Sequence, residues 1–241
     1  MKYELFGGSF PGATVTLDAG EKVITQSGAM AWGDASVEMS TSAEGGLLKA
    51  IGRSLSGASL MFVTHESKEN GSKISFASAF PGTIKEFIID ENHEYLAQKS
   101  AFLVADPTVN VDATVNKKFW AGLLGGEGFI LQKFTGHGTL LAEIDGSVQE
   151  IELKEGQSIK VDTGHVAIFE SSVQYDVESV KGFKNILFGG EGLFMTTLTG
   201  PGKVWLQTLT VRDMANRLAP YMPKQTVSTS TGSSSSSKDR N

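Results

Sequence analysis

The sequence predicts an all-β protein that is built from three tandem repeats and ends in one short helix. The motif Gly-Gly-Glu-Gly occurs twice, at residues 125–128 and 189–192, and the segments around both copies match each other. Apolar and polar residues alternate in many short segments, as they do in half-buried strands. Glycine makes up 28 of the 241 residues, well above the roughly 7% that is usual, which indicates many tight turns.

The repeats share one register, in which Leu17, Ile89 and Leu153 occupy equivalent positions. The second and third repeats are offset by 64 residues, whereas the first and second are offset by 72, because an insertion at 67–73 lengthens the first repeat. The repeats therefore cover about residues 1–71, 72–135 and 136–209.

A repeated unit that cannot bury its own apolar face must stack against its copies, so residues 1–222 are expected to form a single body. The last part of the third repeat, 193–209, resembles the start of a fourth unit. We expect it to pair back onto the first repeat and cover an open strand edge there.

Each repeat is expected to contain several short strands. Apolar and polar residues alternate at 14–17, 150–153, 158–161 and 175–178. Turn-forming Asp, Asn and Gly residues separate such segments. The pair Asp145-Gly146 stands between two alternating segments and predicts a tight β-hairpin.

One helix is predicted at residues 211–219. Thr210 is suited to cap its first turn, and Pro220 ends it. Its apolar residues share one face, which is expected to dock on the sheets or on a neighbouring subunit: Val211, Met214, Ala215 and Leu218. The polar, serine-rich tail at 223–241 has nothing to bury, so we expect it to be disordered.

Composition and charge limit the cellular locations and the binding partners that we expect. The formal net charge is −6, which gives no broad positive field, so nucleic acid is not an expected partner. The absence of cysteine excludes disulfides, thiol nucleophiles and thiolate metal sites and is compatible with a reducing cytoplasm. The chain shows no basic leader and no stretch of roughly 20 apolar residues. A cytoplasmic location is therefore expected.

The sequence contains no recognisable catalytic or metal-binding pattern. None of the four histidines, His65, His93, His137 and His165, stands in a spacing that places two imidazoles on one metal ion. No serine lies in a Gly-x-Ser-x-Gly motif. We therefore predict a non-enzymatic protein without catalytic residues, metal or cofactor. An enzyme built from scattered groups such as Glu127, Glu191 and His137 stays as a competing hypothesis.

The glycine-rich loops have two interpretations. They contain Gly125, Gly126, Gly128, Gly189, Gly190 and Gly192. Glycine-rich backbone can bind phosphate, but such loops normally lead from a strand into a helix with Lys and Ser or Thr nearby. Here each loop leads into an alternating segment. A structural role, repeated with each unit, is therefore preferred.

Two apolar segments precede these loops and follow lysines. They contain Phe119, Trp120, Leu123, Leu124, Phe183, Ile186, Leu187 and Phe188. Aromatic residues beside basic ones are typical of a surface that rests on an anionic membrane. Burial where repeats or subunits meet explains the same pattern and is preferred. If the segments are exposed in the monomer, they predict oligomerisation.

Several motifs together resemble a known family. They are Phe-Pro-Gly at 10–12 and 80–82, the segment 26–32, both Gly-Gly-Glu-Gly loops, and the segments 202–209 and 217–221. The chain resembles a bacterial family of uncharacterised proteins related to yeast altered-inheritance-of-mitochondria protein twenty-four. The resemblance implies a fold like the tryptophan RNA-binding attenuation protein (TRAP-like): three β-sandwich units per chain, similar to a double-stranded β-helix, in a homotrimeric ring. It implies no catalytic residues, and for mitochondrial relatives it implies a role in organising the inner membrane.

The function expected from these observations is that of an oligomeric scaffold or interaction protein, with peripheral membrane contact as one possibility. The alternative is a module that binds a small ligand or nucleic acid in clefts between the repeats.

Overall fold

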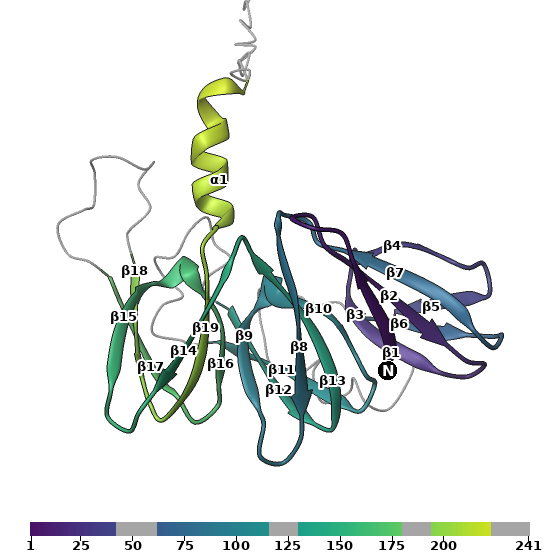
Figure 1. The fold of residues 1–241 in the computed structure, drawn as a ribbon, viewed down its shortest axis with the longest axis horizontal. Helices are drawn as coiled ribbons and strands as arrows, with labels where there is room; N and C mark the ends of the chain where they lie inside the picture. The colour runs from purple at the N-terminus through teal and green to yellow at the C-terminus, as the bar shows by residue number, and fades with distance from the viewer. Residues whose placement is uncertain (42–61, 116–129, 180–193, 223–241) are drawn as a thin grey trace, which may run out of the picture. The chain divides into compact units, whose positions relative to one another are not determined.

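The computed structural model describes residues 1–41, 62–115, 130–179 and 194–222 (Figure 1). The chain divides into two compact units, Met1–Thr210 and Val211–Asn241. Both Gly-Gly-Glu-Gly loops, the apolar segments that precede them and the serine-rich tail lie outside the described residues.

Four strands form the first sheet, in the order β1-β2-β7-β4. The strands are β1 (Lys2–Phe6), β2 (Gly12–Leu17), β7 (Ser72–Ala77) and β4 (Met30–Gly33). The edges of this sheet are therefore β1 and β4.

The second sheet has six strands in the order β5-β6-β3-β10-β13-β8. They are β5 (Val37–Thr41), β6 (Phe62–Ser67), β3 (Lys22–Gln26), β10 (Phe102–Ala105), β13 (Gly138–Asp145) and β8 (Gly82–Ile89). The short 3-10 helix η2 (Lys99–Ala101) precedes β10.

The third sheet also has six strands, in the order β11-β12-β9-β16-β19-β14. They are β11 (Val109–Val115), β12 (Ile130–Gly136), β9 (Tyr95–Gln98), β16 (Val166–Glu170), β19 (Gly202–Gln207) and β14 (Val148–Leu153). Adding six to each strand number of the second sheet gives this order, so the two sheets have the same connectivity.

The fourth sheet has three described strands, in the order β15-β18-β17. They are β15 (Ser158–Asp162), β18 (Phe194–Thr199) and β17 (Gln174–Ser179), and the 3-10 helix η5 (Thr163–His165) follows β15. Every pairing between described strands is antiparallel. The predicted all-β class is confirmed, and so are the strands predicted at 14–17, 150–153, 158–161 and 175–178.

Three apolar cores lie between the successive sheets. One joins the first and second sheets through residues such as Val15 and Ile84, and the next joins the second and third sheets through Phe87 and Trp205. The last joins the third and fourth sheets through Phe169 and Leu198. Leu17, Ile89 and Leu153 are all buried, one in each core. Each is the last residue of its strand that pairs with the neighbouring strand.

Two expectations about strand pairing are wrong. Asp145-Gly146 does not close a hairpin, because β13 lies in the second sheet and β14 in the third. The positive φ of 72° at Gly146 allows the chain to cross from one sheet to the next. The segment 193–209 does not pair with the first repeat: β18 pairs with β15 and β17, and β19 pairs with β14 and β16.

The predicted helix is confirmed as α1 (Val211–Leu218), followed by the 3-10 turn η6 (Ala219–Tyr221) that contains Pro220. It belongs to the second unit of the chain. Within the described residues, no helix has the length and apolar character needed to cross a membrane.

Candidate functional site

The histidines are distributed over separate places in the fold. His65 is buried, shares a 3.0 Å hydrogen bond with the Thr25 hydroxyl, and has its pKa lowered by burial. His165 bonds the Gln207 carbonyl oxygen at 2.7 Å through Nδ1. Across the described ranges, no three His, Asp or Glu side chains lie close enough together to hold a metal ion.

His93 contacts the Asp90 carboxylate at 2.8 Å in an exposed turn. The backbone N–H of Asn92, followed by His93 itself, lowers the pKa of Asp90. This arrangement shapes a turn rather than a reaction centre. Of the competing enzymatic hypothesis, only His137 falls in the described chain, because Glu127 and Glu191 lie outside it.

The residues predicted as an interaction surface also lie outside the described residues, and so do the six glycines of the two loops. They are Phe119, Trp120, Leu123, Leu124, Phe183, Ile186, Leu187 and Phe188, with Gly125, Gly126, Gly128, Gly189, Gly190 and Gly192. The described chain offers a different apolar surface, on the first sheet.

An aromatic pair covers the outer face of that sheet. The rings of Phe6 on β1 and Trp32 on β4 lie 5.8 Å apart, and they remain 39% and 56% exposed. The Phe6 ring lies across Gly12, where a Cβ atom would come within 2.2 Å of it, so only glycine leaves room. Phe10, in the turn between β1 and β2, is 70% exposed. Exposed apolar patches on a protein surface can mark a site of interaction with a partner.

A β-bulge turns Trp32 outward. The register of β4 on β7 shifts between Met30 and Trp32, so Met30 packs into the first core and Trp32 points to the opposite face. β10 and β16 carry the same bulge, between Phe102 and Val104 and between Val166 and Ile168. Val104 and Ile168 are buried against another sheet of the same chain. Trp32 has the same position, but in the described chain no sheet faces it.

Two edge strands, β15 and β4, correspond to strands that are paired with each other in the inner sheets. In the second sheet β3 pairs with β10, and in the third sheet β9 pairs with β16. In the order of strands, β15 of the fourth sheet corresponds to β3 and β9, and β4 of the first sheet corresponds to β10 and β16. Both β15 and β4 are edge strands in the described chain. An unpaired edge presents backbone donors and acceptors to any strand that can match them.

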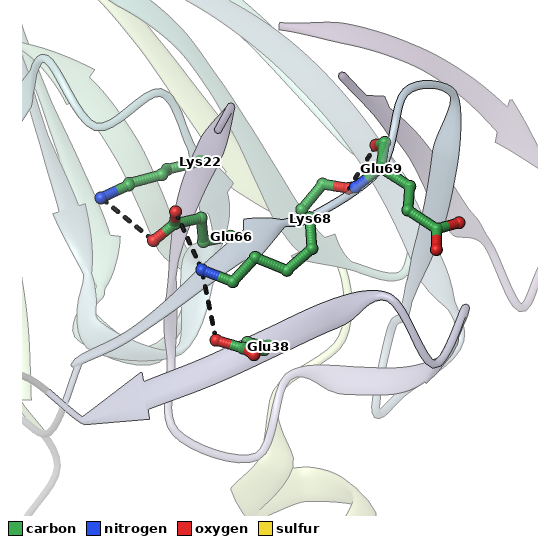
Figure 2. Close-up of polar contacts among 6 residues, drawn as sticks. Lys22, Glu38, Glu66, Lys68 and Glu69 are labelled. Atoms are coloured by element: carbon green, nitrogen blue, oxygen red, sulfur yellow. Dashed lines mark hydrogen bonds and ion pairs between the residues drawn. The ribbon is translucent and has the colours of Figure 1, made fainter. Parts of the chain in front are cut away.

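A charged ladder crosses the strands β5, β6 and β3 at the far edge of the second sheet (Figure 2). Glu66 accepts from Lys22 and Lys68 at 3.2 and 3.1 Å, and Lys68 also reaches Glu38 at 3.3 Å. The Lys68 and Lys22 ammonium groups lower the pKa of Glu66, while Glu66 and Glu38 raise the pKa of Lys68. These exposed pairs satisfy one another and contribute little stability.

A depression of about 640 Å³ with a mixed polar and apolar lining lies near the N-terminus. Its lining includes Lys2, Asp18 and Lys22. The Met1 ammonium group contacts Asp106 at 3.1 Å, and Asp106 also accepts from the Thr139 backbone N–H at 2.7 Å. The mixed charges give this depression no single preferred ligand charge.

The aromatic pair of Phe6 and Trp32 is not apparent in the sequence, where Trp32 falls within the motif segment 26–32. Strand pairing reveals its special position: Trp32 pairs with Ser75 in the first sheet, whereas Ile168 pairs with Trp205 in the third sheet. In the first sheet the larger side chain of the pair therefore belongs to the edge strand β4.

Comparisons with known proteins agree with the family resemblance. The family model described as mitochondrial biogenesis AIM24 matches residues 3–209. An uncharacterised protein of Streptococcus pyogenes serotype M6 is 30% identical over 221 residues, which cover 89% of this chain and 88% of the relative. A crystal structure of a Streptococcus pyogenes protein is similar with a TM-score of 0.73 and 28% identity, over 92% of this chain and 99% of that one. The chain therefore belongs to the AIM24 family.

Proposed function

We propose that this protein is a non-enzymatic scaffold or interaction protein that assembles head to tail from copies of itself. The three stretches of the chain act as TRAP-like repeats, and the first and fourth sheets are two parts of one sheet that two copies complete together. In this arrangement β15 of one copy pairs with β4 of the next. The trimeric ring implied by the family resemblance is the closed form that we propose.

The equivalence of the strand edges carries this proposal. Within the chain, Ala97 on β9 pairs with Ile168 on β16, and Thr25 on β3 pairs with Val104 on β10. Applying the same repeat offsets pairs Val161 on β15 with Trp32 on β4. Both open edges thus have a matching strand in the same register, on another copy. Such heterologous contacts close into rings when the rotation between copies allows it.

The outer aromatic pair supports the same contact. In the chain, Trp205 packs on Phe87 with ring centroids 4.9 Å apart, across the second core. The third sheet presents Ile151 at the position equivalent to Phe87, and Ile151 is only partly buried. In the proposed assembly, Trp32 and Phe6 of a second copy cover Ile151, which gives the exposed rings an apolar partner.

Cross-linking tests the predicted register, because the natural chain contains no cysteine. In the third sheet Tyr95 pairs with Glu170, so the same offsets pair Ile159 with Asp34 of the next copy. Asp34→Cys together with Ile159→Cys places two thiols on these paired residues of neighbouring copies, within reach of a short bis-maleimide, and leaves Trp32 in place. We expect covalent products that end at a trimer on a denaturing gel. The matched control is Asp34→Cys with Lys160→Cys, because adjacent strand residues face opposite sides. Equal cross-linking by both variants, or a monomeric mass in light scattering for the natural chain, would overturn the proposal.

The depression near the N-terminus favours one second candidate, a module that binds a small ligand. Its volume of about 640 Å³ falls in the range of ligand sites, although such sites are usually more apolar. Native mass spectrometry of protein purified from its host tests this candidate. A retained small molecule that is lost in a Lys2→Glu variant would support it, and a mass equal to that of the bare chain would count against it.

Contact with a membrane surface and a cytoplasmic location remain predictions. Flotation of the natural protein with vesicles of phosphatidylglycerol and phosphatidylcholine tests the membrane contact. Protein that stays at the bottom of the gradient at low salt would argue against it.

A further inference from the structure

Among the described strands, β1 of the first sheet has no counterpart in the other sheets. β1 pairs along the outer side of β2, from Lys2 opposite Thr16 to Phe6 opposite Gly12. In the order of strands, β8 of the second sheet and β14 of the third sheet correspond to β2. Neither β8 nor β14 has an outer partner in the described ranges, so the edge that β1 closes in the first sheet is open there in the two inner sheets.

The two open edges differ in character. β14 carries Gln149, Glu150 and Glu152, which are exposed polar residues of the kind that protect an edge. β8 is the longer strand, with eight residues, and pairs with β13 along its full length. Its Ile88 is 51% exposed. The β8 edge is therefore long, partly apolar and suited to accept a further strand.

The exposed side chains of β8 indicate which side chains the added strand needs. Glu86 and Ile88 lie two residues apart and therefore share one face, and both are exposed. We expect an added strand to pair with β8 as β1 pairs with β2, in the antiparallel direction. One of its residues then lies opposite Ile88, and the residue two positions later lies opposite Glu86. An apolar side chain matches the first, and Lys or Arg matches the second. Burial and then the nearby Glu86 carboxylate raise the pKa of Tyr3 to about 12, which indicates that this carboxylate lies close to the Tyr3 hydroxyl.

We propose that the β8 edge binds an extended segment of another protein by strand addition. The bound segment runs antiparallel to β8 and carries an apolar residue followed, two positions later, by a basic one. Backbone hydrogen bonds to β8 give the affinity, and Glu86 and Ile88 give the sequence preference. This surface is separate from the β4 and β15 edges, so it goes beyond the proposed self-assembly and does not depend on it.

A synthetic peptide tests the proposal on the full-length protein. The probe is the acetylated and amidated sequence Gly-Thr-Val-Thr-Lys-Thr-Gly, with binding followed by fluorescence anisotropy and by amide chemical shifts. We expect the shift changes to concentrate on β8. N-methylation of alternate peptide residues, made in both frames, should abolish binding in one frame and spare it in the other, because only alternate N–H groups face β8. Loss in both frames, loss in neither, or changes centred on β14 would overturn the proposal.

Variants of the protein test the side-chain preference. Glu86→Lys should weaken binding of the lysine peptide by roughly two- to fivefold and strengthen binding of the same peptide with Glu in place of Lys, because cross-strand charge pairs contribute amounts of this order. Ile88→Thr should weaken both peptides. The matched control, Glu152→Lys on β14, should leave both affinities unchanged. Light scattering shows whether each variant keeps its assembly state. A Glu86→Lys protein that binds both peptides as the natural chain does would refute the preference.

Discussion

Replacement of Trp32 by alanine is expected to separate assembly from folding. The side chain of Trp32 lies on the outer face of the first sheet and remains 56% exposed in the isolated chain. A tryptophan side chain buries up to about 250 Å², so a second copy that covers the exposed part removes about 140 Å² from water. At about 25 cal/mol per Å², this burial contributes about 3.5 kcal/mol to each contact between copies.

A loss of about 3.5 kcal/mol raises the dissociation constant of the contact roughly 300-fold. Light scattering over a dilution series should therefore show Trp32→Ala dissociating at much higher concentration than the natural chain. The matched control is Ile88→Thr, which changes a residue of similar exposure, 51%, on the separate β8 edge. An unchanged midpoint of dissociation for Trp32→Ala, or an equal shift for both variants, would refute the argument from the aromatic pair.

Three further predictions concern stability. Both amide atoms of Gln132 are buried without a partner, so Gln132→Met should raise the free energy of unfolding by about 1 kcal/mol; an unchanged or lower urea midpoint would contradict this. Burial raises the pKa of Glu143 from 4.5 to about 7, so the folded state binds the proton more tightly than the unfolded state, and stability should fall as pH rises from about 5 through about 7. Glu143→Gln should remove that slope in melts across this range, and a persistent slope would point to another group. A Cβ atom at Gly82 would lie 2.4 Å from the Ile144 backbone oxygen, so Gly82→Ala should destabilise by about 2 kcal/mol. Gly8→Ala, at a site with open space around it and no positive φ, should cost less in the same urea titration.

Local patterns predicted the elements well. Alternation at 150–153 and 158–161 identified β14 and β15, because the side-chain period of a half-buried strand is visible in the sequence itself. The stop at Pro220 placed the end of α1. Asp145-Gly146 predicted a tight hairpin wrongly: the chain leaves β13 here, but the next strand belongs to another sheet. Turn chemistry acts over four residues and says nothing about which distant strands pair.

The candidate site was much harder to predict. The sequence contains Trp32 within the motif segment 26–32 and cannot show whether the sheet that faces this residue belongs to the same chain. The bulge in β4 depends on pairing with β7 and leaves no local signature. Glu86 and Ile88 become a site only because β8 ends a sheet that β1 does not cover. These properties arise from the arrangement of strands that are distant in the sequence, so short sequence segments do not predict them.

The make-up of the second sheet also has a consequence for synthesis on the ribosome. Its strands come from two successive stretches, Lys22–Ser67 and Gly82–Asp145. The sheet therefore stays incomplete until Asp145 has left the exit tunnel, and the nascent chain carries unpaired strands until then. Premature termination before that residue leaves a fragment prone to aggregate rather than a smaller stable domain.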